Sequence, residues 1–187
     1  MKKQTKVILG MLLAVIFGTI LGSSPADASE RSVGDRYDGR RVLIRSMVNG
    51  NRIVDWSQAN RANVIIYYNL GRWNQEWRMS YQQANDSYIF MTGGNHENGL
   101  AAFMTARNVR NGEGRRLIGT EFTNLASMQW RLHHLGRHER GDVYILQNMS
   151  DGTVLDIPGS DVNSYPTLIL HPRHGRANQQ FILDVLD

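Results

Sequence analysis

Cysteine is absent from this chain of 187 residues. Disulfide bonds, thiolate metal sites and cysteine nucleophiles are therefore excluded together. The sequence also lacks a nucleophile elbow, a phosphate-binding glycine loop and the paired-histidine helix of zinc proteases. A carboxylate pair for glycoside hydrolysis stays open, because the separation of two carboxylates depends on the fold. From these absences we expect a domain stabilised by its hydrophobic core, and no enzyme.

Lysine is absent after Lys6, so every later basic residue is arginine. One explanation is compositional drift. Another is that a chain without side-chain amines offers no site for ubiquitin attachment, which would favour a protein that enters a eukaryotic cell. The net charge of the chain after residue 28 is only about +2. This charge is unlike the concentrated basic surface of a nucleic-acid-binding protein, so no nucleic-acid partner is expected.

The N-terminal segment has the features of a signal peptide. Three lysines precede an apolar run from Val7 to Leu21, and Ala26-Asp27-Ala28 supplies small residues for a cleavage site. A transmembrane helix is the alternative, but the run is short for a bilayer span and no stop-transfer cluster follows it. We therefore predict a signal peptide at 1–28, a single domain at 29–187, and a secreted or periplasmic protein without membrane insertion.

Helical periodicity is weak in the remaining chain, and short β-type runs alternate with turn signals. Asn49-Gly50, the dipeptide most typical of tight hairpins, separates the first two runs. We predict an all-β domain whose first strands are Arg41–Arg45, Arg52–Asp55, Val64–Tyr68 and Glu76–Met79.

This pattern of strands and turns recurs along the chain. Val42–Asp55 and Val143–Asp156 each contain an apolar strand, a turn with glycine and a second apolar strand that ends in aspartate. A weaker copy begins at Ser87–Thr92. Each copy closes on an aromatic residue, and these residues lie about 50 positions apart: Trp77, Trp130 and Phe181. We predict three pseudo-repeats that share one core, at about 38–84, 85–138 and 139–187.

The closing segments resemble the Gln-x-Trp motif of the ricin B-type lectin family. Gln75-Glu76-Trp77 matches it fully, Gln179-Gln180-Phe181 has Phe in place of Trp, and Met128-Gln129-Trp130 has lost the Gln. The resemblance covers nearly the whole chain after the leader. It implies a β-trefoil, in which six strands close a short barrel and six more cap it as three hairpins.

The resemblance implies a sugar pocket in the first repeat. A sugar needs an aromatic platform for its apolar face, with a carboxylate and amides around its hydroxyls. Asp55 falls where the family places the carboxylate, and Tyr67 falls where it stacks an aromatic ring. Asn74 and Gln75 fall on the amide pair that binds the sugar edge and orients the aspartate. Each residue taken alone also has an ordinary structural explanation.

The third repeat has the same set with one replacement. Asp156, Asn178 and Gln179 match the first repeat, whereas His171 stands at the aromatic position. A neutral imidazole stacks more weakly than Tyr or Trp and loses stacking when protonated. In the middle repeat Met104 is expected at the carboxylate position, with Ser127-Met128 in place of the amide pair. We therefore expect two sugar sites and a blind middle repeat.

Two further signals are assigned to ordinary structure. His133, His134 and His138 fit no standard zinc spacing, so we predict that they lie in a solvated loop and that the protein needs neither a metal nor another cofactor. Arg140-Gly141-Asp142 spells an integrin-type tripeptide at a strand entrance, where Gly-Asp is common turn chemistry.

The expected function is therefore carbohydrate binding. By resemblance, the partners are galactose- or sialic-type glycans of host cells and the catalytic subunit of a bacterial toxin. The ricin-like subunits of cytolethal distending toxins are the nearest such case, although this chain departs from them in lacking cysteine. The alternative is a β-trefoil scaffold for protein interaction, such as a toxin assembly subunit or an inhibitor, with vestigial sugar pockets. A third possibility, an exported enzyme, would require a deep cleft with perturbed titratable groups.

Overall fold

The computed structural model describes residues 33–59, 62–92, 102–108, 115–120, 123 and 125–186. The predicted signal peptide lies outside these residues, so the boundary between leader and domain stays a prediction. Asn60-Arg61 and Asn98-Gly99, dipeptides that the sequence predicts as turns, also lie outside them. Within the described ranges, no helix is long and apolar enough to cross a membrane. The described chain is built of antiparallel strands joined by short 3-10 turns.

Six strands close into a barrel. Each pairs with the next in the order β1, β4, β5, β8, β9, β12, and β12 pairs with β1 again. A closed barrel leaves no unpaired edge that could recruit another strand. The barrel strands are β1 (Arg41–Ser46), β4 (Trp77–Gln82), β5 (Ser87–Thr92), β8 (Gln129–His138), β9 (Gly141–Asn148) and β12 (Phe181–Val185).

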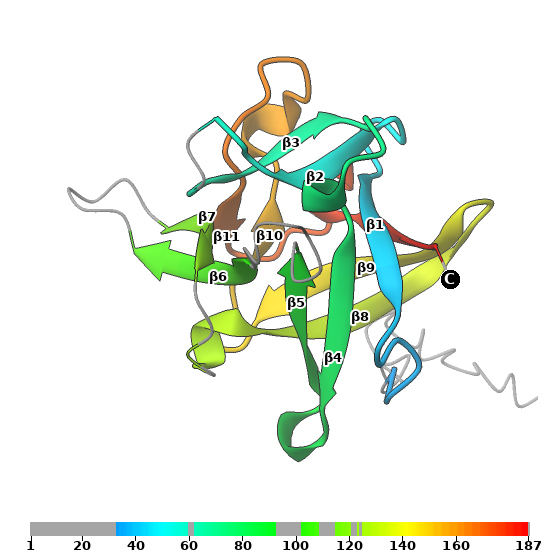
Figure 1. Cartoon of the computed structure of the whole chain (residues 1–187), viewed down its shortest axis with the longest axis vertical. Helices are drawn as coiled ribbons and strands as arrows, with labels where there is room; N and C mark the ends of the chain where they lie inside the picture. The colour runs from blue at the N-terminus through cyan, green and yellow to red at the C-terminus, as the bar shows by residue number, and fades with distance from the viewer. Residues whose placement is uncertain are drawn as a thin grey trace, which may run out of the picture.

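The other six strands form three hairpins: β2 (Arg52–Trp56) with β3 (Val64–Tyr68), β6 (Ala102–Asn108) with β7 (Arg115–Thr120), and β10 (Val154–Asp156) with β11 (Ile169–His171). The hairpins contact one another, because β7 pairs with β11 and single bridges join Asn63 to Ile118 and Ile65 to Thr167. Figure 1 shows the hairpin strands grouped above and to the left of the barrel strands. A six-stranded barrel with three hairpins is a β-trefoil, so the predicted fold class is confirmed.

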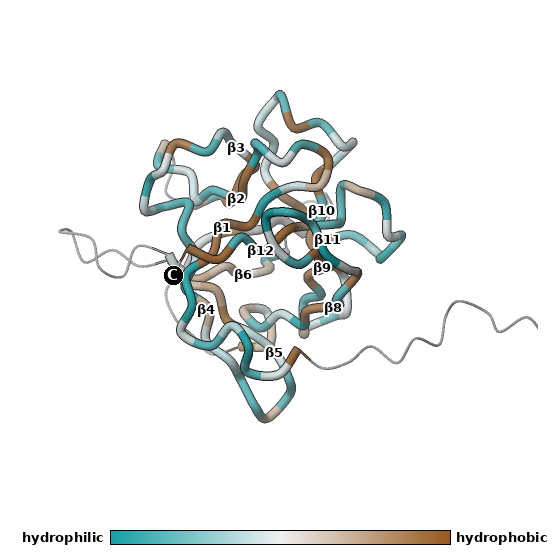
Figure 2. Tube along the Cα trace, turned by 90° about the vertical axis from the view of Figure 1, so that its right-hand side faces the viewer, coloured by the Kyte–Doolittle hydropathy of each residue, from teal (hydrophilic) through white to brown (hydrophobic). Residues whose placement is uncertain are grey.

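Hydrophobic residues concentrate in the strands at the middle of the molecule, and the outer loops are mostly hydrophilic (Figure 2).

Three of the 3-10 turns occupy equivalent places, because each directly precedes a barrel strand: η1 (Trp73–Gln75) before β4, η3 (Ala126–Met128) before β8 and η5 (Ala177–Gln179) before β12. Two more turns, η2 (Gln83–Asn85) and η4 (Pro158–Ser160), have no such counterpart among the described residues.

Several local predictions differ from the structure. Three predicted strands end too early, because β1, β2 and β4 continue to Ser46, Trp56 and Gln82. The strand expected from Glu76 begins at Trp77, because the preceding residues form η1. The solvated loop predicted for His133, His134 and His138 is wrong, because all three lie in the ten-residue strand β8. His133 is buried there, and its Nε2 lies 2.8 Å from Oε1 of Gln147 on the neighbouring strand.

The closing aromatic residues join the barrel to the hairpins. Trp77 and Trp130 are fully buried, and their indole Nε1 atoms donate to the backbone oxygens of Val54 and Met104, both at 3.1 Å. Phe181 is equally buried but has no donor. The same strand-to-hairpin bond in two repeats shows that Val54 and Met104 are equivalent positions.

Replacing Trp77 tests how far the core depends on these aromatic residues. We expect Trp77→Ala to lower the free energy of unfolding by about 3–5 kcal/mol, because it leaves a large cavity. Trp77→Phe, which copies the third repeat, is expected to cost about 1–3 kcal/mol, since the bond to Val54 and part of the ring volume are lost. Urea denaturation measures both values, and an alanine variant as stable as the wild type would contradict this account.

Candidate carbohydrate-binding site

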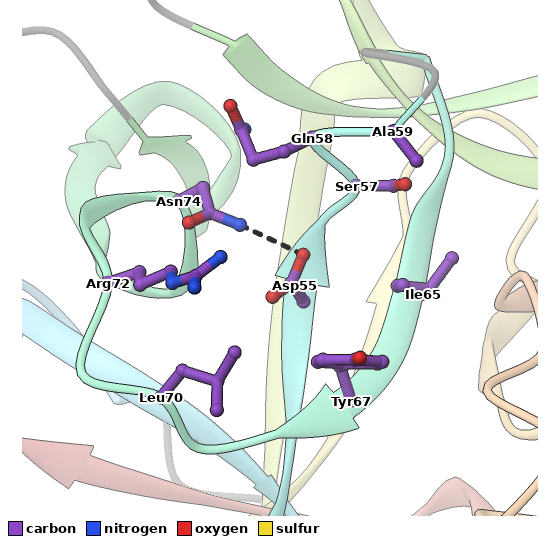
Figure 3. Close-up of a pocket in the computed structure, with 9 residues that line it drawn as sticks. All are labelled: Asp55, Ser57, Gln58, Ala59, Ile65, Tyr67, Leu70, Arg72 and Asn74. Atoms are coloured by element: carbon purple, nitrogen blue, oxygen red, sulfur yellow. Dashed lines mark hydrogen bonds between the residues drawn. The ribbon is translucent and has the colours of Figure 1, made fainter.

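The first repeat contains a pocket of about 250 Å³ between the β2–β3 hairpin and the loop that leads into η1. Figure 3 shows Asp55 near its centre, with Asn74 on one side and Tyr67 on the other. Its lining residues are Asp55, Ser57, Gln58, Ala59, Ile65, Tyr67, Leu70, Arg72 and Asn74. Three of the four residues predicted for this site therefore line one pocket.

The carboxylate of Asp55 is fixed by two side-chain amides. Nδ2 of Asn74 donates to Oδ1 at 3.0 Å, and Nε2 of Gln75 donates to Oδ2 at 2.7 Å. Because Nδ2 of Asn74 also donates to the backbone oxygen of Trp56 at 2.9 Å, its amide orientation is defined by two acceptors. A buried carboxylate without such donors would be strongly destabilising. The two amides therefore make it possible for Asp55 to be charged at this buried position.

Gln75 positions the aspartate and does not line the pocket. Its side chain is fully buried, and its Nε2 also donates to the backbone oxygen of Tyr68 at 2.6 Å. Its Oε1 accepts from the backbone N–H groups of Leu70 at 2.8 Å and Arg72 at 3.5 Å. These bonds favour the orienting role expected for Gln75 and leave its amide little capacity to contact a sugar.

Asn74 offers an unused acceptor beside the carboxylate. Its Oδ1 is one of two buried side-chain polar atoms without a hydrogen-bond partner among the described residues. A buried acceptor without a partner is uncommon, and it indicates a place for a ligand or water hydrogen. Asn74 lines the pocket, but its Oδ1 has almost no exposed surface, so a sugar hydroxyl can donate to it only if the side chain shifts.

The pKa of Asp55 is raised above its ordinary value, chiefly because burial disfavours the charged form. The hydrogen bonds from Gln75 and Asn74 and the positive charge of Arg72 act in the opposite direction. The carboxylate is thus desolvated and held ready to accept hydrogen bonds, which strengthens each bond that a ligand hydroxyl makes to it.

Tyr67 supplies the apolar wall of the pocket. It is half-buried on β3, opposite Ile53 of β2, and forms part of a cluster with Tyr68 and Tyr165. The Tyr67 ring lies 4.7 Å from the Tyr165 ring, centroid to centroid, at an interplanar angle of 59°. The contact restrains the Tyr67 ring, as a stacking platform requires.

The third repeat repeats this hydrogen-bond pattern around Asp156. Asn178 Nδ2 donates to both carboxylate oxygens at 3.1 Å, and Gln179 Nε2 donates to Oδ2 at 2.9 Å. Gln179 also binds the backbone oxygen of Pro172 and the backbone N–H of His174, as Gln75 binds Tyr68 and Leu70. His171 is exposed at the end of β11, in the place of Tyr67. The four predicted residues again lie together.

In the middle repeat, Thr105 and not Met104 occupies the aspartate position. The bond of Trp130 to Met104 matches that of Trp77 to Val54, so the residue after each acceptor, Thr105 and Asp55, is equivalent. The position predicted for the carboxylate, Met104, is therefore wrong by one residue. Thr105 bonds Thr120 Oγ1 at 2.8 Å and offers a hydroxyl where the outer repeats have a carboxylate.

Met128 lies at the glutamine position of the same repeat. Its sulfur accepts from the backbone N–H of Thr123 at 3.4 Å, in the place where Oε1 of Gln75 accepts from Leu70. A thioether has no N–H to orient a carboxylate. Loss of the glutamine donor and loss of the aspartate therefore occur together in this repeat.

Some pocket residues are not found by the sequence pattern. Leu70, Arg72 and the β2-end residues Ser57 and Gln58 line the first pocket through loop geometry. His174 lies beside Asp156, with its Nε2 3.4 Å from Oδ2. The spacing His171-Pro172-Arg173-His174, two imidazoles three positions apart, was the signal available for it.

No family model and no curated protein sequence matches the chain. Solved structures do. A designed threefold-symmetric protein, ThreeFoil, is 24% identical with a TM-score of 0.63, over 80% of this chain and 100% of that one. The ricin B-like lectin of Macrolepiota procera is 15% identical with a TM-score of 0.59, over 79% and 96%. A chain of the Haemophilus ducreyi cytolethal distending toxin is 14% identical with a TM-score of 0.58, over 78% and 83%.

Structural matches at identities this low show the fold and nothing further. The architecture is the β-trefoil of ricin B-like lectins, and the structural neighbours include lectins and toxin subunits. The resemblance first seen in the Gln-x-Trp closings is thereby confirmed as a likeness of structure.

Removing the orienting amide tests the first pocket without touching its lining. We expect Gln75→Ala to raise the pKa of Asp55 further, because the Gln75 bond favours the charged carboxylate. The free energy of unfolding should fall by about 1–3 kcal/mol, since buried groups lose a partner. Carboxyl-carbon NMR titration measures the pKa. Gln179→Ala is the matched control, and an equal shift of Asp55 in that variant would contradict the assignment.

Proposed function

We propose that this protein is a non-enzymatic lectin that binds glycans through its first pocket. The observation that carries the proposal is the buried carboxylate of Asp55, held by two amides and faced by the Tyr67 ring across one small pocket. This is a complete set for a sugar: charged acceptor, neutral acceptor and apolar wall.

Each group has a distinct task in this proposal. The apolar C–H face of a galactose-like ring stacks on Tyr67. Two neighbouring hydroxyls donate to Asp55, in charge-assisted hydrogen bonds that are stronger than neutral ones. A third hydroxyl donates to the buried Oδ1 of Asn74, which has no partner among the described residues, after a shift of the side chain that exposes this atom. Gln75 does not contact the sugar in this proposal, because its task is to orient the carboxylate of Asp55.

Galactose-type and sialic-type glycans are the proposed ligands. The Macrolepiota procera lectin was solved with lactose, and the Polyporus squamosus lectin was solved with an epitope of sialic acid, galactose and N-acetylglucosamine. The group of side chains around Asp156 in the third repeat serves as a second, weaker site in this proposal. Two sites on one rigid domain raise the avidity for a surface that carries many glycans.

We further propose that the protein is exported and recognises host-cell glycans as the binding subunit of a bacterial toxin. The features behind this proposal are the leader sequence, the absence of lysine after it, and the likeness to a chain of the Haemophilus ducreyi toxin. The alternative is a scaffold for protein interaction. It predicts that the protein binds no glycan, because its sugar pockets would be vestigial.

Truncating Asp55 tests the proposal directly. Asp55→Ala removes at least one charge-assisted hydrogen bond and should weaken glycan binding by roughly 10- to 100-fold, from about 1.5–3 kcal/mol. Tyr67→Ala, which leaves the amide network intact, should also weaken binding. A glycan panel read beside circular dichroism separates loss of binding from loss of fold. Asp156→Ala is the matched control for the other pocket, and binding that survives both aspartate changes would favour a different surface.

Acidification should release glycan from the first pocket. Below its pKa, Asp55 is protonated and accepts hydroxyls poorly, and because the pKa is raised, the loss should begin at a higher pH than for an ordinary aspartate. Affinity measured from pH 7 downward on the Asp156→Ala variant isolates this pocket. Affinity that stays constant down to pH 3 would argue against a role for the ionised carboxylate.

A further inference from the structure

The site around Asp156 in the third repeat differs from the pocket of the first repeat at two positions that change its chemistry. His171 stands where the first pocket has Tyr67, and His174 stands where it has Leu70, since the backbone N–H groups of Leu70 and His174 make the same bond to the orienting glutamine. An aromatic wall and an aliphatic side chain are thus replaced by two imidazoles beside a buried carboxylate. Because the repeats are equivalent, His171 and His174 belong to one site, the counterpart of the first pocket, and are not two unrelated surface histidines.

The three side chains converge. Ligand atoms of Asp156, His171 and His174 all lie within 4.8 Å of one another. The distance between Nε2 of His174 and Oδ2 of Asp156 is 3.4 Å. Tetrahedral zinc, with bonds of about 2.0–2.1 Å, holds neighbouring ligand atoms about 3.3 Å apart. One pair already has this separation, and His171, exposed at the end of β11, has to turn its ring toward the other two ligands to complete the site.

Hydrogen bonds prepare these ligands. Nδ1 of His171 lies 3.0 Å from the backbone oxygen of Pro172, which can only accept, so the proton is on Nδ1 and the Nε2 lone pair is free. Such an outward N–H bond to a carbonyl typically orients a metal-binding histidine. Asn178 and Gln179 hold the carboxylate of Asp156 in the same way.

His174 requires one change of tautomer. Its Nδ1 accepts from the exposed backbone N–H of Arg176 at 3.2 Å, which places the neutral ring's proton on Nε2, facing Asp156. When a metal binds to Nε2, the ring carries its proton on Nδ1 instead. The Arg176 N–H then loses its acceptor on the ring and donates to a water molecule. The exposure of that amide keeps the change small.

We propose that the Asp156 site of the third repeat binds a divalent transition-metal ion, with zinc as the best match, through Asp156, His171 and His174. Two imidazoles and one carboxylate suit zinc better than calcium or magnesium, which prefer oxygen ligands. Three protein ligands leave one position open to water or a ligand hydroxyl. No metal was expected from the sequence here. The site is separate from the first pocket, whose Tyr67 and Leu70 cannot supply these donors.

Calorimetric titration of the untagged protein with zinc chloride tests the proposal, with cobalt absorption as a second readout of coordination. We expect one zinc per chain, and a tetrahedral cobalt spectrum. His171→Tyr and His174→Leu install the residues of the first pocket, so they should fold and should each weaken zinc binding roughly tenfold or more. His134→Gln changes an exposed histidine outside the pocket and should leave the affinity unchanged.

Two outcomes would overturn the metal site: zinc affinity in the His171→Tyr, His174→Leu double variant equal to that of the wild type, or an equal loss in His134→Gln. Glycan binding by the Asp156→Ala variant in the presence of a chelator reports on the first pocket alone. The metal site and the glycan function therefore fail independently.

Discussion

A buried carboxylate held by two amides is the interaction on which each outer pocket depends. Asp55 and Asp156 are both almost fully buried, and each accepts from one asparagine and one glutamine. The glutamines also bind backbone groups of the hairpin end and of the following loop. One side chain therefore fixes the charge, the loop and the start of the closing strand, so the pocket and the fold are stabilised together.

The three pseudo-repeats are variations on this arrangement. The first combines aspartate with Tyr67 and Leu70, the third combines it with two imidazoles, and the middle one replaces aspartate and glutamine by Thr105 and Met128. The barrel tolerates all three versions, because the closing aromatic residues are buried in every repeat. Pocket chemistry is thus largely separable from core packing, which lets one fold carry different sites.

Much of the fold could be predicted from the sequence, because strand patterns and closing aromatics are local features. The aspartates and amides were found for the same reason, since their spacing from the closing aromatic is short. Thr105 was missed because its position depends on the length of a turn, and His174 because its place beside Asp156 follows from loop geometry. The histidines of β8 were misplaced because a strand rich in polar residues resembles a loop in sequence.

We propose that a bound sugar lies between Asp55, Asn74 and Tyr67. Lactose titration followed by two-dimensional nitrogen–proton NMR is the measurement that probes this contact, because the side-chain amide of Asn74 reports on the pocket itself. We expect saturable shifts of that amide and of the Leu70 backbone N–H, with none at Ser127 or Met128 in the middle repeat. Shifts confined to residues outside the outer pockets, or no shift with any galactose- or sialic-type glycan, would contradict it.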